Sequence, residues 1–268
     1  LIDGEAVVNE AWSFPGGSAA NTIYGLAKLG VKTGFVGAVG DDDEGKLMRQ
    51  DFSKVGVDTS QIKLKHGVKT GSVVCLSDRS GRRSLYVMPG ANNLLTMDDL
   101  DLAYINQAKL LHISSFADDR QLQLLLGLMD RLDLSVKVSF SPGALYAAKG
   151  FKVLAPILAR THLLFINQNE IEQLTGEDFM AGADSCLKQG CQIVVVTLGR
   201  GKTLANKKTA IAYIRDADSK YFIELARRPK TPALDATGAG DAFACGFLYG
   251  LLKGKGLEEC GRLGDIVA

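Results

Sequence analysis

Short apolar, β-branched runs alternate with amphipathic helical segments along most of the 268-residue chain. Candidate core strands cover 33–39, 109–114, 135–140, 163–166 and 192–197. Helical periodicity is clearest in 20–29, 42–55 and 122–132. Such alternation is typical of a mostly parallel sheet covered by helices on both faces. The sequence therefore predicts an α/β fold, a three-layer α/β/α sandwich.

Two regions break this alternation. Residues 5–14 and residues 68–88 both look like strands, and neither region contains a helical segment. Within the second region, Thr70–Ser77 and Ser84–Met88 flank a polar segment in which Gly81 supplies a permissive backbone. This pattern predicts a β-hairpin.

We expect a small, discontinuous β unit formed by 1–16 and 68–89. It would project from an α/β core formed by 17–67 and 90–268. An edge hairpin of the main sheet is the alternative. The chain starts at Leu1 and stops inside an apparent helix, so we expect both natural ends of the protein to lie outside it.

Charge and cysteine usage narrow the class of protein. The chain has 31 Lys and Arg residues and 30 Asp and Glu residues. This balance gives no excess of positive charge that would favour binding to nucleic acid or to an anionic membrane. No apolar run reaches the ~18 residues of a membrane span. The five cysteines lack CxxC spacing and the three histidines are dispersed, which argues against a disulfide framework or a zinc site. We expect a cytoplasmic protein with neither nucleic-acid nor membrane partners.

The densest chemical signal is Asp235-Ala-Thr-Gly-Ala-Gly-Asp241, which runs into the helical pattern 242–252. Glycines before a helix leave backbone N–H groups unshielded, and those donors with the helix dipole form an anion site. A carboxylate beside that site, Asp241, can accept a proton from a hydroxyl during phosphoryl transfer. The alternative is that Asp241 only stabilises the helix N-terminus.

A second glycine turn enters a helix at Pro15-Gly-Gly-Ser-Ala-Ala-Asn-Thr22. Gly16 and Gly17 permit close approach of the backbone to a ligand. Asn21 offers both a donor and an acceptor, which suits paired sugar hydroxyls. The alternative is a tight turn in which Ser18 caps the helix.

These segments together resemble the ribokinase-like (PfkB) family of carbohydrate and nucleoside kinases. That family has a Gly-Gly-x-x-x-Asn segment near its N-terminus and an Asp-x-x-Gly-Ala-Gly-Asp signature near its C-terminus. Between them, Asn167-Gln-Asn-Glu170 matches the family's Asn-x-x-Glu motif, and 194–199 matches the strand that leads to its nucleotide loop. The four motifs occur in the family's order, and the resemblance spans essentially the whole chain.

The resemblance implies an ATP-dependent kinase that phosphorylates a hydroxyl of a sugar or nucleoside, with Mg²⁺ and, in some members, K⁺. Asp241 would be the catalytic base, and the residues that precede it would form the anion hole. The substrate would contact the first glycine turn, and Ser114, at the end of a core strand, would face the pocket. The residues thus implicated are Gly238, Ala239 and Gly240 for the anion hole, and Gly17 and Asn21 for the substrate.

The resemblance also implies cofactor and metal sites. Asn167 and Glu170 would organise Mg²⁺ and phosphates, with Glu170 acting through water. Asp235 and Thr237 match positions that hold a monovalent cation in some members. Thr197, Gly199 and Gly201 would form the nucleotide loop. The β unit would be the substrate lid, which mediates homodimers in some members while others are monomers.

Some family features are absent or altered. The loop Thr197-Leu-Gly-Arg-Gly201 is one residue shorter than the common form, and Ser141 stands where many relatives have Asp. The family's first-strand Asp would lie before Leu1. These departures leave the substrate open among fructose, ribose, 2-keto-3-deoxygluconate and nucleosides.

Other functions fit the sequence less well. Gly199-Arg-Gly-Lys-Thr203 ends like a P-loop, but the glycine required at 196 is Val196. No Gly-x-Gly-x-x-Gly follows a strand with an acid about twenty residues on, as a dinucleotide site needs. A catalytically silent sugar or nucleotide sensor on the same fold remains an alternative.

Overall fold

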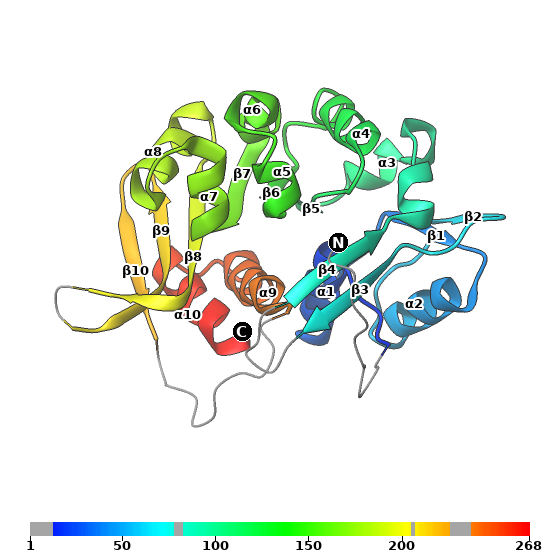
Figure 1. Ribbon diagram of the computed structural model, residues 1–268, viewed down its shortest axis with the longest axis horizontal. Helices are drawn as coiled ribbons and strands as arrows, with labels where there is room; N and C mark the ends of the chain where they lie inside the picture. Colours follow the sequence, from blue (N-terminus) through cyan, green and yellow to red (C-terminus); the bar gives the residue numbers. More distant parts are fainter. Residues whose placement is uncertain (1–12, 78–82, 205–206, 226–236) are drawn as a thin grey trace, which may run out of the picture.

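The computed structural model describes residues 13–77, 83–204, 207–225 and 237–268. Its centre is a six-stranded sheet with the order β10-β9-β8-β7-β6-β5 (Figure 1). Strands β5 to β8 are parallel, whereas β9 and β10 are antiparallel to their neighbours. The strands are β5 (Leu110–Ser114), β6 (Lys137–Ser141), β7 (Thr161–Asn167), β8 (Ile193–Thr203), β9 (Thr209–Asp216) and β10 (Lys220–Glu224).

Helices cover both faces of this sheet, as predicted (Figure 1). Successive residues of β7 alternate between the two layers: Leu164 and Ile166 pack with one set of helices, Leu163 and Phe165 with the other. The first set is α3 (Leu102–Ile105), α4 (Asp119–Met129), α5 (Gly143–Ala147), α6 (Phe151–Arg160), α7 (Gln168–Thr175) and α8 (Phe179–Gln189). The second is α1 (Ser18–Lys28), α9 (Ala239–Leu252) and α10 (Leu257–Val267).

Helix α9 is held close to α10 by small residues. A Cβ on Gly246 would lie 2.3 Å from the carbonyl oxygen of Leu263, so only glycine permits this approach. Phe243 and Phe247 pack from α9 into the core on the sheet side. This packing fixes the direction of α9 and therefore the place of its first turn.

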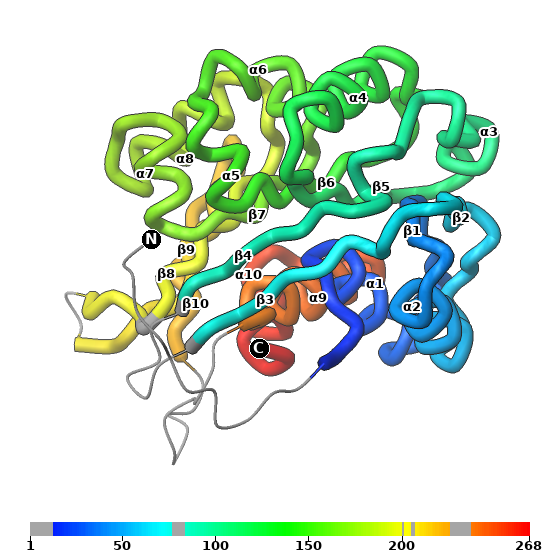
Figure 2. The backbone as a smooth tube through the Cα atoms, turned by 45° about the vertical axis from the view of Figure 1, so that its right-hand side comes forward, coloured from blue at the N-terminus to red at the C-terminus, as the bar shows by residue number. Residues whose placement is uncertain are grey.

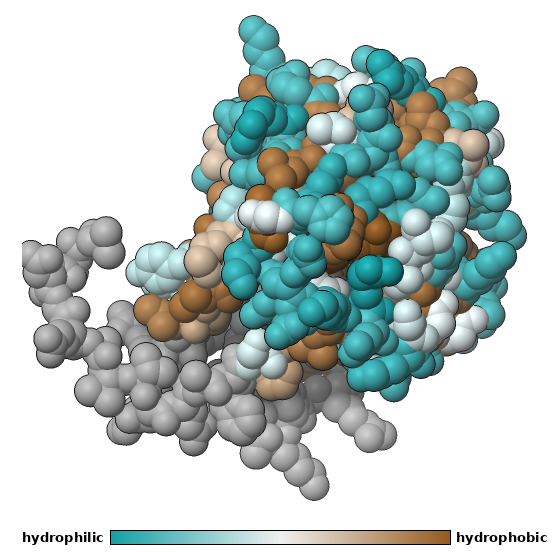
Figure 3. Space-filling model, turned by 90° about the vertical axis from the view of Figure 1, so that its right-hand side faces the viewer, coloured by the Kyte–Doolittle hydropathy of each residue, from teal (hydrophilic) through white to brown (hydrophobic). Residues whose placement is uncertain are grey.

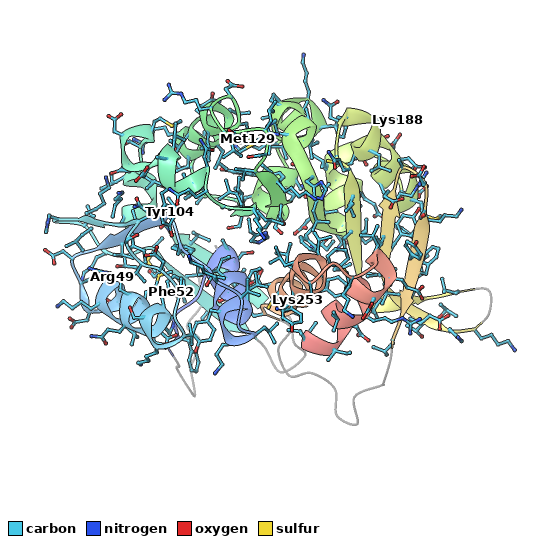
Figure 4. All side chains as sticks on the ribbon, turned by 180° about the vertical axis from the view of Figure 1, so that it is seen from behind. Arg49, Phe52, Tyr104, Met129, Lys188 and Lys253 are labelled. Carbon is cyan, nitrogen blue, oxygen red and sulfur yellow. The ribbon has the colours of Figure 1, made fainter. Side chains whose placement is uncertain are left out.

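The predicted core strand 33–39 behaves differently from expectation. Strand β1 (Gly37–Gly40) pairs in parallel with β2 (Ile62–Lys65) as a separate two-stranded sheet, not within the six-stranded one. Helix α2 (Asp43–Lys54) covers this pair, with Phe52 turned inward and Arg49 at the surface (Figure 4). Apolar periodicity identifies a strand but not its partner, which explains the error. Strands β9 and β10 were not anticipated either.

The predicted hairpin is confirmed: β3 (Ser72–Ser77) pairs with β4 (Arg83–Met88) in antiparallel register. This hairpin runs past α1 and α9 in Figures 1 and 2. Its apolar side chains are exposed on both faces, including Val73 at 53% and Val74 at 45%. Figure 3 shows brown, apolar groups at the surface of the molecule among the teal ones. Two short 3₁₀ helices follow, η1 (Gly90–Leu94) and η2 (Met97–Asp99). The predicted strand 5–14 lies mostly outside the described residues.

Candidate active site

The helix start at Asp241 forms as the sequence predicts. Gly238 is the N-cap of α9 in a left-handed conformation with φ 82°, and its carbonyl accepts the N–H of Ala242 at 2.8 Å. Ala239 and Gly240 open the helix, and Asp241 lies in its first turn. The N-cap glycine has no side chain to cap this end, and the backbone donors and positive dipole of a helix N-terminus favour an anion.

The Asp241 carboxylate faces the start of α1. Its Oδ1 accepts the Ser18 hydroxyl at 2.6 Å, and its Oδ2 accepts the Asn21 amide at 2.8 Å. The buried Thr22 hydroxyl donates to the Asp241 carbonyl at 3.3 Å. The two predicted glycine turns therefore meet, although they are more than 200 residues apart in sequence.

Helix α1 is not capped in the way that one alternative predicted. Gly17, with φ 112°, is the N-cap and makes no side-chain capping bond. Ser18 is already helical and uses its hydroxyl on Asp241. The roles of Ser18 and Thr22 were missed from the sequence. The available signal was the spacing of Ser18 and Asn21, which puts both on one helix face.

The carboxyl ends of the parallel strands bring further predicted residues to one edge of the sheet. Ser114 lies opposite Ser141 in the register of β5 and β6, and Asn167 lies opposite Thr197 in that of β7 and β8. All four are half-buried. Open α/β sheets bind ligands at this edge.

Asn167 and Glu170 form a capping box at the start of α7. The Asn167 Oδ1 accepts the Glu170 N–H at 2.9 Å, and the Glu170 Oε2 accepts the Asn167 N–H at 3.0 Å. Burial raises the pKa of the Glu170 carboxyl above its ordinary value. A desolvated carboxylate at the ligand edge of the sheet suits an arriving cation. The capping bond of Glu170 also stabilises the N-terminus of α7.

The predicted nucleotide loop is a bulge within β8. The pairing with β9 steps from Thr197–Ala212 to Lys202–Ala210, so three extra residues bulge out of β8. Gly199 has φ 57° and open space around it. Gly201 has φ 87°, and a Cβ there would lie 2.3 Å from the Thr209 methyl. The lack of a side chain at Gly201 therefore also allows β8 to pack closely against β9.

A crevice of about 430 Å³ lies between α1 and α9. It is lined at one end by Asn21, Thr237 and Gly238, and elsewhere by apolar groups that include Cys245. Asp235, the other predicted cation ligand, lies outside the described residues. Within the described ranges, no three His, Cys, Asp or Glu side chains gather as a metal cluster. No helix in this part of the chain is long and apolar enough to cross a membrane.

A carboxylate in the first turn of a helix, hydrogen-bonded to a second helix start on an α/β fold, is compatible with a phosphotransferase that acts on a hydroxyl group. The comparisons agree. The model of the pfkB family carbohydrate kinases matches residues 3–268, and the chain belongs to that family. It is a sugar or nucleoside kinase of the family.

Individual relatives cover most of the chain. An uncharacterized sugar kinase of Archaeoglobus fulgidus is 36% identical over 91% of this chain and 92% of its own length. The cytidine kinase of Thermococcus kodakarensis is 32% identical over 94% and 85%. The crystal structure of ribokinase from Thermotoga maritima superposes with a TM-score of 0.79 at 26% identity, over 98% of this chain and 82% of that one.

Proposed function

We propose that the protein transfers the γ-phosphoryl group of ATP to a hydroxyl of a sugar or sugar-like substrate, with Asp241 as the catalytic base. The observation that carries this proposal is the pair of hydrogen bonds that Ser18 and Asn21 donate to the Asp241 carboxylate. Each oxygen retains a lone pair, so the oriented carboxylate can accept a proton from an incoming hydroxyl. The N–H groups at Gly238–Gly240 face the developing charge of the transferred group.

The nucleotide side of the site follows from the sheet edge. We infer that the bulge containing Thr197, Gly199 and Gly201 approaches the ATP phosphates, since glycine backbone offers N–H donors without side-chain obstruction. Asn167 and Glu170 would hold hydrated Mg²⁺. When bound, the ion would neutralise phosphate charge during transfer. Thr237, with Asp235, would hold a monovalent cation such as K⁺.

The acceptor side is formed by Gly17, Asn21 and Ser114. The similarity to a sugar kinase of Archaeoglobus fulgidus favours a sugar. A nucleoside acceptor is the second candidate, because the Thermococcus kodakarensis cytidine kinase is similar over almost the same length. A catalytically silent sensor of sugars or nucleotides is the non-enzymatic alternative. The two hydrogen bonds that orient the Asp241 carboxylate argue against it.

Replacement of Asp241 by Asn tests this function. Turnover is measured with ATP over a panel of sugars and nucleosides, and acceptor binding by calorimetry. The variant keeps the side-chain shape but loses the base, so kcat should fall at least about 10³-fold while binding changes little. A wild type that binds an acceptor but never phosphorylates it would overturn the kinase proposal. A variant with a near-normal rate would overturn the role of Asp241.

We further propose that the hairpin β3–β4 is a substrate lid and a homodimer contact. Its two faces differ. Cross-strand pairs place Val73, Val87, Cys75 and Leu85 on one face, which is apolar near the root of the hairpin. The pair Ser77–Arg83 falls on this face at its far end. The opposite face mixes Ser72, Ser84 and Tyr86 with apolar side chains. We assign the mixed face to the substrate and the apolar face to a second copy of the chain, in a cytoplasmic enzyme.

A further inference from the structure

The root of the hairpin is tied to the start of α2 by Asp42. This residue is the N-cap of α2, and its Oδ1 accepts the Gly45 N–H at 3.0 Å. Its other oxygen, Oδ2, accepts the backbone N–H of Thr70 at 2.7 Å. Thr70 lies two residues before β3 begins. One carboxylate therefore joins a helix start to the segment that leads into the hairpin.

The Thr70 hydroxyl extends this link to a third element. It donates to Asp42 Oδ1 at 2.5 Å and accepts the Gly40 N–H at 2.9 Å. Gly40 is the last residue of β1. Bonds to the charged carboxylate, that of the Thr70 hydroxyl first, lower the pKa of Asp42 to about 2, so it is ionised at neutral pH. The end of β1, the start of α2 and the root of β3 thus share one charge-assisted network.

The returning chain is fixed beside this network. Lys69 accepts the N–H of Ala91 through its carbonyl at 2.8 Å, and Ala91 is fully buried. Gly90, with φ 51°, lies so close that a Cβ there would be 2.4 Å from the Lys69 carbonyl oxygen. The segment that enters the hairpin at Thr70 and the segment that leaves it at Gly90 are therefore both fixed to the rest of the protein. The hairpin beyond them is exposed.

We propose that Asp42 and Thr70 are positioning residues that fix the angle of the hairpin relative to the acceptor site. The proposal rests on the proposed function of the hairpin as a lid. Each strand extends about 20 Å from its root, at roughly 3.3 Å per residue, so a small change of angle at Thr70 moves the tip by far more. Without the anchor, the closed position would be populated less and water would reach the phosphoryl group more often.

Three substitutions at the anchor and one matched control test the idea. Thr70→Val keeps the shape and the backbone N–H but removes the hydroxyl. Thr70→Ser restores the hydroxyl. Asp42→Asn keeps a good N-cap residue but removes the charge. The control, Asp178→Asn, changes a comparable N-cap aspartate that accepts two backbone N–H groups at the start of α8.

We would measure the acceptor KM, kcat, and ATP hydrolysis without transfer. Thr70→Val and Asp42→Asn should raise KM and the share of futile hydrolysis about tenfold, the loss expected for a hydrogen bond to a charged group, with a smaller effect on kcat. Thr70→Ser and Asp178→Asn should stay within about twofold of wild type. Normal KM and normal hydrolysis in both anchor variants would overturn the proposal.

A second measurement works without turnover. Hydrogen exchange at 69–77 reports directly on the root of the hairpin. It should be faster in Thr70→Val and normal in Thr70→Ser. If the wild type phosphorylates no acceptor, the proposed function fails, and equal exchange in wild type and Thr70→Val would still separately overturn the anchor.

Discussion

At the residue scale, the chemistry that we propose depends on how Asp241 is held. Its two oxygens are bonded to different side chains of α1, so rotation of the carboxylate would break at least one bond. Ser18 and Asn21 are separated by three positions and therefore lie on the same helix face. Orientation before the substrate arrives is the property that a general base requires, since the lone pair must meet the hydroxyl proton.

Ser18→Ala should reduce kcat/KM about tenfold, because it removes one of these two charge-assisted bonds and leaves the other. Steady-state kinetics with the best acceptor would measure this loss. Ser18→Thr should recover most of the activity. Ser53→Ala is a suitable control, since Ser53 also lies in a helix but bonds only to the Arg49 carbonyl on the exposed side of α2. Full activity in Ser18→Ala would mean that Asn21 orients the carboxylate alone.

The sequence singled out Asp241 and Asn21 because each follows glycines at a helix start, and the structure brings these two side chains into contact. It could not identify Ser18, whose partner lies 223 residues away. Local spacing carries information about helix faces and turns, whereas a contact at this separation depends on how α1 and α9 pack. The capping role of Glu170 was likewise hidden, because a capping box has the same spacing as the motif for which Glu170 was singled out.

At the element scale, prediction succeeded where burial is strongest. Residues 109–114, 163–166 and 192–197 were expected as strands and lie within about two residues of β5, β7 and the first part of β8. Residues 163–166 and 193–196 are continuously apolar, as expected for strands that helices cover on both faces. Strand 33–39 was placed in the wrong sheet, since apolar residues do not specify a pairing partner. Strand β9, whose apolar run includes two alanines, and the short β10 were missed.

The hairpin β3–β4 gives a prediction at this scale. A two-stranded hairpin is marginal in water by itself, and this one exposes apolar side chains on both faces. If the face that carries Val73 and Val87 contacts a second copy, Val87→Glu should bury a charge among apolar side chains and weaken association at least about a hundredfold. Sedimentation at micromolar concentrations would show this. Ser84→Glu, on the mixed face, should leave the dimer intact, and a monomeric wild type would contradict the assignment.

At the scale of the whole molecule, two apolar layers enclose the sheet, and a histidine is among the titratable groups that they bury. His112 on β5 is only 9% exposed, and its Nδ1 lies 2.9 Å from the Ser139 hydroxyl on β6. In the described part of the chain, its Nε2 has no hydrogen-bond partner. Burial lowers the pKa of His112 to about 4 from its ordinary 6.5. Folding therefore keeps this ring neutral at a pH where the unfolded chain would protonate it.

This difference predicts how the free energy of unfolding depends on pH. Below pH 6.5 the unfolded state binds a proton at His112 that the native state does not, so stability falls as the pH decreases. The loss should reach about 3 kcal/mol near pH 4 and stop growing below it. Urea unfolding of wild type and His112→Gln between pH 7 and pH 4 isolates this contribution, because other groups titrate equally in both proteins. His162→Gln should remove a smaller part, since that ring is only half-buried. Parallel stability curves for wild type and His112→Gln would show that His112 accepts its proton in the folded protein as readily as in the unfolded chain.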